Sequence, residues 1–388
     1  MQTSEINRFF NCERDFFTEN PLADENLGRF VNQTHPLNKL LLSLQMRRNC
    51  GIIGDFGSGK SSFLRKMEME LISQGHCAKY FQVTLPIDDY SRTRLVFLRN
   101  TLRNLLSVIH ENTELRNMFD PQLLLNEEHR FEFSITLEDY DKEINKLSGE
   151  LTGGMKHNLL SMLMSAELKA SLKAETGSET SEKGSINMPV HNEHTLLESI
   201  FMLANKLEKP VIMLIDEFDK IGRDDMSSPQ WDKQLLQVLE LSREIMNTEK
   251  LLFVFSLQKE LYLKLQKARQ GIGDISLLGL IQSYEKLNDF DFGFATEVIS
   301  KSLEYAGYSM DISNLFAPDI IKAVHCDTKG KIRLFIQDIN ELIQQAYSDK
   351  KQQIDKEVFI KCLRKKWDDL SEDDFSQHLE NLLKGLPL

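Results

Sequence analysis

One short segment combines glycines, a lysine and a serine at a spacing that suits phosphate binding. Gly54 is followed, after four other residues, by Gly59, Lys60 and Ser61. An apolar, strand-like run comes directly before this segment, and a helical pattern comes directly after it. Glycines let successive backbone N–H groups face one anion, and the helix that follows adds its positive end. The segment therefore predicts a phosphate-binding loop between a strand and a helix.

The side chains of this loop indicate that the phosphates belong to a nucleotide bound with Mg²⁺. Lys60 is expected to supply a point charge to the β- and γ-phosphates, and Ser61 is expected to place its hydroxyl on Mg²⁺. The residues predicted to bind the nucleotide phosphates are Gly54, Asp55, Phe56, Gly57, Ser58, Gly59, Lys60, Ser61 and Ser62.

A second candidate feature is a pair of carboxylates at the end of an apolar run. Asp216 and Glu217 directly follow Val211–Ile215. In open parallel sheets, ligands bind at the carboxyl ends of the strands. We therefore predict that Asp216 belongs to the Mg²⁺ shell and that Glu217 polarises the water that attacks the γ-phosphate. Asp219 and Lys220 extend this motif, and a structural role suits them as well as a functional one.

The order of apolar runs predicts an α/β fold followed by a helical region. Buried parallel strands are expected at 50–53, 80–83, 211–215 and 251–255, with helices over 63–72 and 95–109 between them. After Asp289 the pattern becomes purely helical, with helices expected over 294–305, 312–324, 332–347 and 356–367 and a short amphipathic helix near the end.

Composition excludes several classes of protein. The 47 Lys and Arg against 59 Asp and Glu give a net charge of −12, so bulk charge does not drive binding to nucleic acid. The five cysteines lack C-x-x-C spacing, which argues against a disulfide framework or a zinc site and favours a reducing cytoplasm. No signal-peptide pattern is present and no apolar run approaches the ~18 residues of a membrane span. We expect a cytoplasmic protein with no membrane contact.

The loop and the acidic strand end together resemble those of AAA+ ATPases. Within that family the sequence is similar to the branch with origin-recognition and replication-initiator ATPases, TnsC-like transposition regulators and STAND signalling ATPases. The segment from Asn20 to Leu44 looks like the family's N-terminal stretch, which wraps the adenine, and Asn32 and Gln33 stand near the place of a family arginine. The resemblance implies an ATPase that uses ATP and Mg²⁺ and forms homo-oligomers through its ATP site.

The resemblance also implies roles for residues outside the two motifs. Ser256, after the run at 251–255, matches the polar residue that senses the γ-phosphate, with Gln258 as the second choice. Gly330 to Arg333 matches the sensor-2 pattern, in which Arg333 reaches the γ-phosphate. Arg269 lies where an arginine finger donated to a neighbouring subunit is expected.

The expected architecture is an AAA+ P-loop core with a parallel sheet flanked by helices, followed by an all-α lid domain. The expected divisions are an adenine-side segment at 1–48, an α/β nucleotide-binding domain at 49–289 with a long insertion at about 111–189, a helical lid at 290–367 and an amphipathic tail at 368–388 that docks on this chain or a neighbour.

For the biological role we expect an ATP-driven switch that oligomerises with nucleotide and recruits or controls a DNA-directed partner, as a transposition regulator or defence-system ATPase would. Arg92, Arg99 and Arg103 fall near one face of a predicted helix, with Arg94 adjacent, and suit duplex DNA.

Two alternatives stay open. A STAND-like signalling or anti-phage ATPase would control a protein effector without DNA contact, and the acidic charge, the insertion and the tail favour it. A structural nucleotide binder with low turnover is the other alternative, and the complete set of Lys60, Asp216, Glu217 and Arg333 argues against it.

Overall fold

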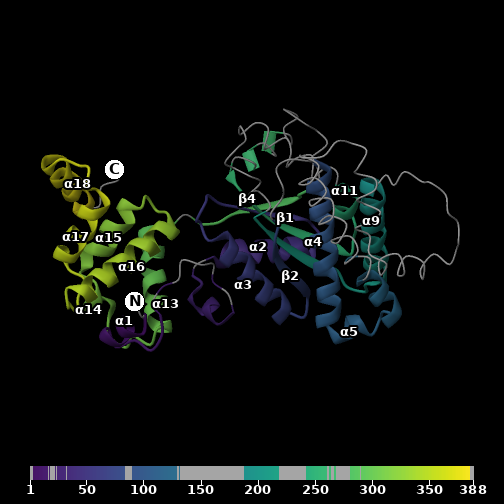
Figure 1. Cartoon of the computed structure of the whole chain (residues 1–388), viewed down its shortest axis with the longest axis horizontal. Coiled ribbons are helices and arrows are strands. Elements are labelled where there is room, and N and C mark those ends of the chain that lie inside the picture. Colours follow the sequence, from purple (N-terminus) through teal and green to yellow (C-terminus); the bar gives the residue numbers. More distant parts are fainter. Residues whose placement is uncertain are drawn as a thin grey trace, which may run out of the picture. The chain divides into compact units, whose positions relative to one another are not determined.

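The computed structural model in Figure 1 describes residues 3–15, 17, 22, 24–31, 33–83, 90–128, 131, 188–217, 242–259, 262–263, 266–267, 280–288 and 290–384. These residues form two units. The first combines residues 1–85 with residues 209–388, and the second contains residues 86–208.

In the described part of the first unit, five strands form one sheet in the order β2-β3-β4-β1-β5, and each neighbouring pair is parallel. The strands are β1 (Cys50–Ile53), β2 (Cys77–Gln82), β3 (Val211–Asp216), β4 (Leu251–Leu257) and β5 (Ser283–Lys286). β1, β3 and β4 are buried along their whole length, which explains why their sequences read as continuous apolar runs. The predicted α/β class with a helical C-terminal region is confirmed.

The fifth strand is not predicted by the sequence pattern. β5 has the sequence SYEK, and its residues are half-buried or exposed. It pairs only with β1, at the edge of the sheet. A strand at the edge of a sheet needs no apolar run, so the apolar pattern of its sequence does not identify it as a strand.

The parallel register brings the carboxyl ends of several strands to one edge of the sheet. Ile53 is aligned with Leu257, and Ile215 is aligned with Phe255. Just beyond β5, the backbone N–H of Leu287 donates to the carbonyl of Ile53 at 3.0 Å. The segments that follow β1, β3, β4 and β5 therefore begin side by side.

Helices α2 (Thr34–Gln45) and α3 (Lys60–Ser73) share one apolar core with one face of this sheet. Leu40 of α2 and Phe63 and Leu64 of α3 are fully buried there. Alternate residues of the strands complete the core, as the two-residue period of a strand requires; they include Ile52, Ile212, Leu214, Leu252 and Val254. α3 begins directly after the predicted phosphate loop, and its core contacts fix the direction of the helix.

The C-terminal part of the first unit is helical. Its helices are α13 (Phe292–Tyr305), α14 (Ile312–Leu315), α15 (Pro318–Asp327), α16 (Ile332–Ser348), α17 (Lys356–Lys366) and α18 (Glu372–Lys384). They enclose an apolar core, to which Phe10, after the N-terminal helix α1 (Thr3–Phe9), also belongs. Asp291, Asp311 and Asp355 each precede a helix and accept a backbone N–H of its first turn, at 2.7, 2.8 and 3.0 Å. Such caps stabilise a helix by about 1 kcal/mol each.

One predicted helix of this region is in fact two. The pattern over 312–324 predicts a single helix, but α14 ends at Leu315 and α15 begins at Pro318. Between them Phe316 is extended and bridges to Ile354. Proline cannot continue a helix from its N-terminal side, whereas it suits a first helical position.

The predicted amphipathic tail docks on its own chain. Phe375 and Leu382 of α18 are 5% and 0% exposed and belong to the core of the helical region. Lys366 of α17 and His378 of α18 both contact the buried carboxylate of Asp327, at 2.7 and 3.4 Å.

The second unit contains helices α4 (Tyr90–Glu111), α5 (Thr113–Arg116) and α9 (Met188–Lys206), and residues 121–128 are also helical. Arg99 is buried, so the predicted basic face of α4 is wrong at this position. Arg94, which is adjacent to that face, forms an ion pair with Glu193 of α9 at 3.1 Å. Arg103 is exposed, whereas the side chain of Arg92 lies outside the described residues. Of the predicted insertion, residues 129–130 and 132–187 also lie outside them.

Within the described ranges, no helix is both long enough and apolar enough to span a membrane. The five cysteines are free thiols. Burial raises the pKa of Cys12 to about 11 and that of Cys50 to about 12, so these two thiols stay protonated at neutral pH.

The core of the helical region generates a stability prediction. Phe335 of α16 is fully buried in it, whereas Leu334, the residue before it, is 42% exposed. Phe335→Ala should lower the free energy of unfolding by about 3–5 kcal/mol, because it removes a buried ring and leaves a cavity. Leu334→Ala, the matched control, should change it by less than about 1 kcal/mol. Urea unfolding followed by circular dichroism measures both, and equal losses in the two variants would contradict this packing of α16.

Candidate nucleotide-binding site

The loop between β1 and α3 has a backbone that requires glycine. Gly57 and Gly59 have φ values of +77° and +89°, in the left-handed region that side chains rarely adopt. A Cβ atom at Gly57 would also lie 3.2 Å from Cβ of Arg333, so glycine is needed for the close approach of α16. α3 starts immediately after Gly59, and its first backbone N–H groups have no partners within the helix.

Two polar side chains of the loop fit an anion. The ammonium of Lys60 donates to the carbonyl oxygens of Gly54 and Asp55 at 2.7 and 3.0 Å, so it is folded back over the loop. The Oγ atom of Ser58 is buried and has no hydrogen-bond partner among the described residues. Leaving a buried hydroxyl unsatisfied costs about 1–3 kcal/mol, and a phosphate oxygen is a partner that would remove this cost.

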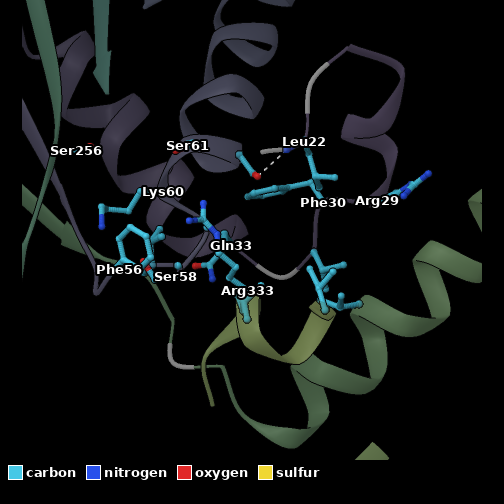
Figure 2. Close-up of a pocket in the computed structure, with 18 of the residues that line it drawn as sticks. Leu22, Arg29, Phe30, Gln33, Phe56, Ser58, Lys60, Ser61, Ser256 and Arg333 are labelled. Carbon is cyan, nitrogen blue, oxygen red and sulfur yellow. Dashed lines mark hydrogen bonds between the residues drawn. The ribbon is translucent and has the colours of Figure 1, made fainter. Parts of the chain in front are cut away.

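The N-terminal segment is fastened to the start of α3. The backbone N–H of Leu22 donates to Oγ of Ser62 at 2.9 Å, as the dashed line in Figure 2 shows. Ser61 lines the cavity beside it, while Ser62 also serves this structural contact.

The carboxylate of Asp216 is held by two hydroxyl groups. Asp216 is 2% exposed, Tyr80 of β2 donates to its Oδ2 at 2.9 Å, and Ser256 of β4 donates to its Oδ1 at 2.8 Å. Burial, and then the neighbouring Asp216, raise the pKa of Tyr80 well above its usual range, so this hydroxyl remains a donor. The guanidinium of Arg65 lies over the Tyr80 ring, 4.4 Å from its centroid. Sequence reasoning missed Tyr80, because only the strand order shows that β2 lies beside β3.

Glu217 lies at the turn that follows β3. Its φ of +59° is rare for a residue other than glycine and costs on the order of 1–2 kcal/mol. The residue is half-buried and lines the same cavity as Asp216. Two consecutive acidic residues therefore line the same cavity.

The first turn of α16 completes the site from the helical region. The guanidinium of Arg333 lies over the ring of Phe56, 4.8 Å from its centroid, and both side chains are labelled in Figure 2. Ile332 and Ile336 of the same helix line the cavity. The Gly330–Arg333 pattern therefore brings an arginine directly onto the phosphate loop.

These groups surround one cavity of about 250 Å³ (Figure 2). Its lining contains most of the predicted site residues: Phe56, Gly57, Ser58, Gly59, Lys60, Ser61, Ser62, Asp216, Glu217, Ser256, Gln258 and Arg333. Gly54 and Asp55 contribute the carbonyls that accept from Lys60. Other residues of the lining belong to two segments that the resemblance had pointed to, 20–44 and 330–333: Leu22, Arg29, Phe30, Val31, Gln33 and Ile332. Sequence reasoning did not predict the rest of the lining, which includes Phe17, Leu287, Phe294, Val298, Ser302 and Ile336.

The donor set at the acidic wall fits Mg²⁺. Ser61 and Asp216 line the same cavity and offer hydroxyl and carboxylate oxygens, the atoms that Mg²⁺ prefers. The hydrogen bonds from Tyr80 and Ser256 leave further lone pairs on the Asp216 carboxylate, since its two oxygens accept about four in total. Mg²⁺ usually takes few ligands from a protein and completes its shell with phosphate oxygens and water.

Some predicted residues lie outside the described ranges. These are Arg269, the predicted finger, together with Asp219, Lys220 and Asn32. Their roles stay predictions.

Comparison with solved structures finds similar chains of low identity. The Thermotoga maritima Holliday junction branch migration motor RuvB is 10% identical with a TM-score of 0.39, over 89% of this chain and 72% of that one. The Aeropyrum pernix ORC2 protein, in ADPNP–ADP complexes, is 12% identical with a TM-score of 0.41, over 92% and 70%. A Walker-type ATPase of Pyrococcus abyssi is 13% identical with a TM-score of 0.43, over 95% and 79%. Among curated proteins, no match was found.

A family model gives a firmer assignment. The model described as the KAP family P-loop domain matches residues 31–264, which is more than half of the chain. The matched range includes the phosphate loop, Asp216, Glu217 and Ser256. The chain therefore belongs to the KAP family of P-loop NTPases.

Proposed function

We propose that this protein binds ATP with Mg²⁺ and hydrolyses it to ADP and phosphate. One observation carries the proposal: Lys60, the consecutive pair Asp216 and Glu217, and Arg333 come from three separate segments and line the same cavity. A cationic loop, two carboxylates and an arginine are complementary parts for phosphoryl transfer to water.

Binding is assigned to the loop. The ammonium of Lys60 exchanges the carbonyls of Gly54 and Asp55 for phosphate oxygens, and the hydroxyl of Ser58 gains the acceptor that it lacks among the described residues. The N–H groups at the start of α3 face the same anion. The backbone N–H groups are held in place before the ligand arrives, so for these donors little reorganisation opposes binding.

Hydrolysis is assigned to Glu217 and Arg333. The Glu217 carboxylate orients a water and accepts its proton, while the Arg333 guanidinium stabilises negative charge on the transferred group. Mg²⁺, when bound by Ser61 and Asp216, neutralises charge on the phosphates. Tyr80 and Ser256 hold the Asp216 carboxylate in position for this role.

We also propose that the chain works as an AAA+ switch of the initiator, TnsC-like and STAND branch and assembles through its ATP site. In this proposal Arg269 is the finger donated to a neighbouring subunit. The free cysteines suit a reducing cytoplasm, which is the proposed location.

A protein effector is the proposed partner of the switch. The hypothesis of a DNA-directed partner was based on the arginines of α4. Of these, Arg99 is buried and Arg94 is paired with Glu193. The net charge of −12 opposes contact with a polyanion and suits a protein surface. Assembly that depends on DNA would instead support a DNA-directed partner.

Removing the lysine of the loop tests nucleotide binding. Lys60→Ala should weaken ATP binding by on the order of 100-fold, because charge-assisted hydrogen bonds to phosphate are lost. Lys66→Ala, on the same helix but away from the cavity lining, should leave the affinity unchanged and serves as the control. Isothermal titration measures both, and an unchanged affinity in Lys60→Ala would refute the loop as the phosphate site.

Neutralising the carboxylate of Glu217 separates ATP binding from ATP hydrolysis. Glu217→Gln should bind ATP with near-normal affinity and release phosphate on the order of 100-fold more slowly, because the amide cannot accept the proton of water. Glu249→Gln changes the charge equally at a side chain that is 81% exposed, and it should turn over normally. Normal phosphate release by Glu217→Gln would move the role of base to another residue.

Assembly is tested by the solution mass of Glu217→Gln with ATP and Mg²⁺, measured by light scattering with and without duplex DNA. We expect an oligomer that forms with ATP alone and is indifferent to DNA, and we expect Lys60→Ala to remain monomeric. Assembly only in the presence of DNA would favour a DNA-directed partner. A monomer under all conditions would rule out Arg269 as a finger in a neighbouring subunit.

A further inference from the structure

A second cavity, of about 290 Å³, lies at the edge of the sheet opposite the phosphate loop. Its floor contains Ile212 and Leu252, which are the second residues of β3 and β4 and are aligned with each other. Its walls are the C-terminal ends of α2 and α3, the two helices that share an apolar core with this face of the sheet (Figure 1). Because α3 begins at the phosphate loop and ends here, the two cavities lie at opposite ends of one helix.

The lining of this second cavity combines an apolar interior with positive charge. Leu44 and Leu71 in its walls are 4% and 1% exposed. Arg47, His76 and Lys209 also line it, and none of the described residues of the lining is acidic. The whole chain has a net charge of −12, so these cations set the cavity apart from the average surface. Such a lining favours a ligand with an apolar body and a negative charge.

The cationic side chains are not needed to complete the two helix ends. At the end of α2, the backbone N–H of Arg47 donates to the carbonyl of Leu44 at 2.8 Å. At the end of α3, the backbone N–H of His76 donates to the carbonyl of Leu71 at 2.9 Å. Because backbone N–H groups already satisfy these last carbonyls, the side chains remain available for another partner.

The present contacts of these side chains are weak. The guanidinium of Arg47 lies 3.5 Å from the carboxylate of Glu249, but the two side chains are 52% and 81% exposed, and such a surface pair contributes little. Among the described residues, no hydrogen bond or ion pair engages the side chain of His76 or of Lys209. A carboxylate that enters the cavity therefore displaces only one exposed ion pair.

The size of the cavity favours a small molecule over a protein segment. Its volume lies close to the lower end of the ~300–1,000 Å³ that is typical of small-molecule sites. A sheet floor and two helix walls suit one apolar chain, whereas an amphipathic helix requires a groove for apolar anchors on successive turns.

We propose that this cavity binds a small amphiphilic carboxylate, with its apolar chain between α2 and α3 and its carboxylate against Arg47, His76 and Lys209. The planar guanidinium of Arg47 suits both oxygens of a carboxylate. Burial of the chain provides affinity, and the cations fix its orientation. No residue that lines this cavity also lines the nucleotide cavity, so the proposal does not depend on the proposed function.

Straight-chain acids test the apolar part of the site. Isothermal titration with the unaltered protein should show octanoate binding roughly 15-fold more tightly than hexanoate, since each buried methylene contributes about 4-fold. 1-Octanol, which has the chain without the charge, should bind at least about 10-fold more weakly than octanoate. The affinities should be the same with and without saturating ADP and Mg²⁺, so failure of the proposed function leaves this test intact.

The variant that removes the main cation without straining the fold is Arg47→Gly. Arg47 has a φ of +56°, the conformation that glycine adopts most easily at a helix end, so this variant should unfold at no lower temperature than the unaltered protein. Its affinity for octanoate should fall at least about 10-fold. Lys350→Gly is the matched control, because Lys350 follows α16 with a φ of +55° and is not part of the lining. It should bind octanoate normally.

Three results would overturn the proposal. Equal affinities for octanoate, hexanoate and octanol would remove the match between ligand and lining. An unchanged affinity in Arg47→Gly, or loss of octanoate binding when ADP is present, would place the acid elsewhere, in the second case in the nucleotide cavity. Absence of binding by every acid would leave a protein segment as the alternative occupant.

Discussion

The parallel pairing of β1 between β4 and β5 is the constraint on which the rest of the site depends. Because parallel strands end at one edge, the phosphate loop after β1, Asp216 at the end of β3 and Asn288 after β5 all lie at that edge of the sheet. Gly51 shows how tight the pairing is, since a Cβ atom there would lie 2.9 Å from the side chains of both Leu257 and Tyr284. A larger residue at Gly51 would press on β4 and β5 together and would displace the phosphate loop and the segment that follows β5 at once.

The buried carboxylate at the end of β3 is held by two uncharged groups. Burying Asp216 is costly unless its oxygens are hydrogen-bonded, and the strands on either side supply the donors, Tyr80 from β2 and Ser256 from β4. Both donors are neutral hydroxyls. An arginine or lysine in their place would hold the carboxylate equally well but would cancel its charge. The hydroxyls satisfy the oxygens without adding a positive charge, which suits the proposed binding of Mg²⁺.

Features with strong local signals could be predicted from the sequence, and features that depend on strand order could not. The four predicted strands and the start of α3 are confirmed, because buried parallel strands and a glycine-rich loop leave continuous patterns in the chain. β5 was not predicted, because an edge strand needs no apolar run. The break before Pro318 was not predicted either, because the apolar spacing continues across it. Tyr80 belongs to no motif, and its place beside Asp216 follows from β2 lying next to β3. Gln33 lies in the segment that the resemblance points to, but its contact with Asn288 could not be predicted, because it depends on β5.

The contact of Arg333 with Phe56 links the nucleotide site to the helical region through a weak interaction. Phe56 is 55% exposed, and a cation–π contact at an exposed site contributes about 0.5–1 kcal/mol. A hydrogen bond between a guanidinium and a phosphate contributes about 1.5–3 kcal/mol, so the guanidinium would leave the ring for a phosphate. Because the next residue, Phe335, is fully buried in the core of the helical region, a change at Arg333 acts on the helix that organises this core. In the proposed switch, α16 is therefore the element through which the nucleotide state would reach the surface of the helical region.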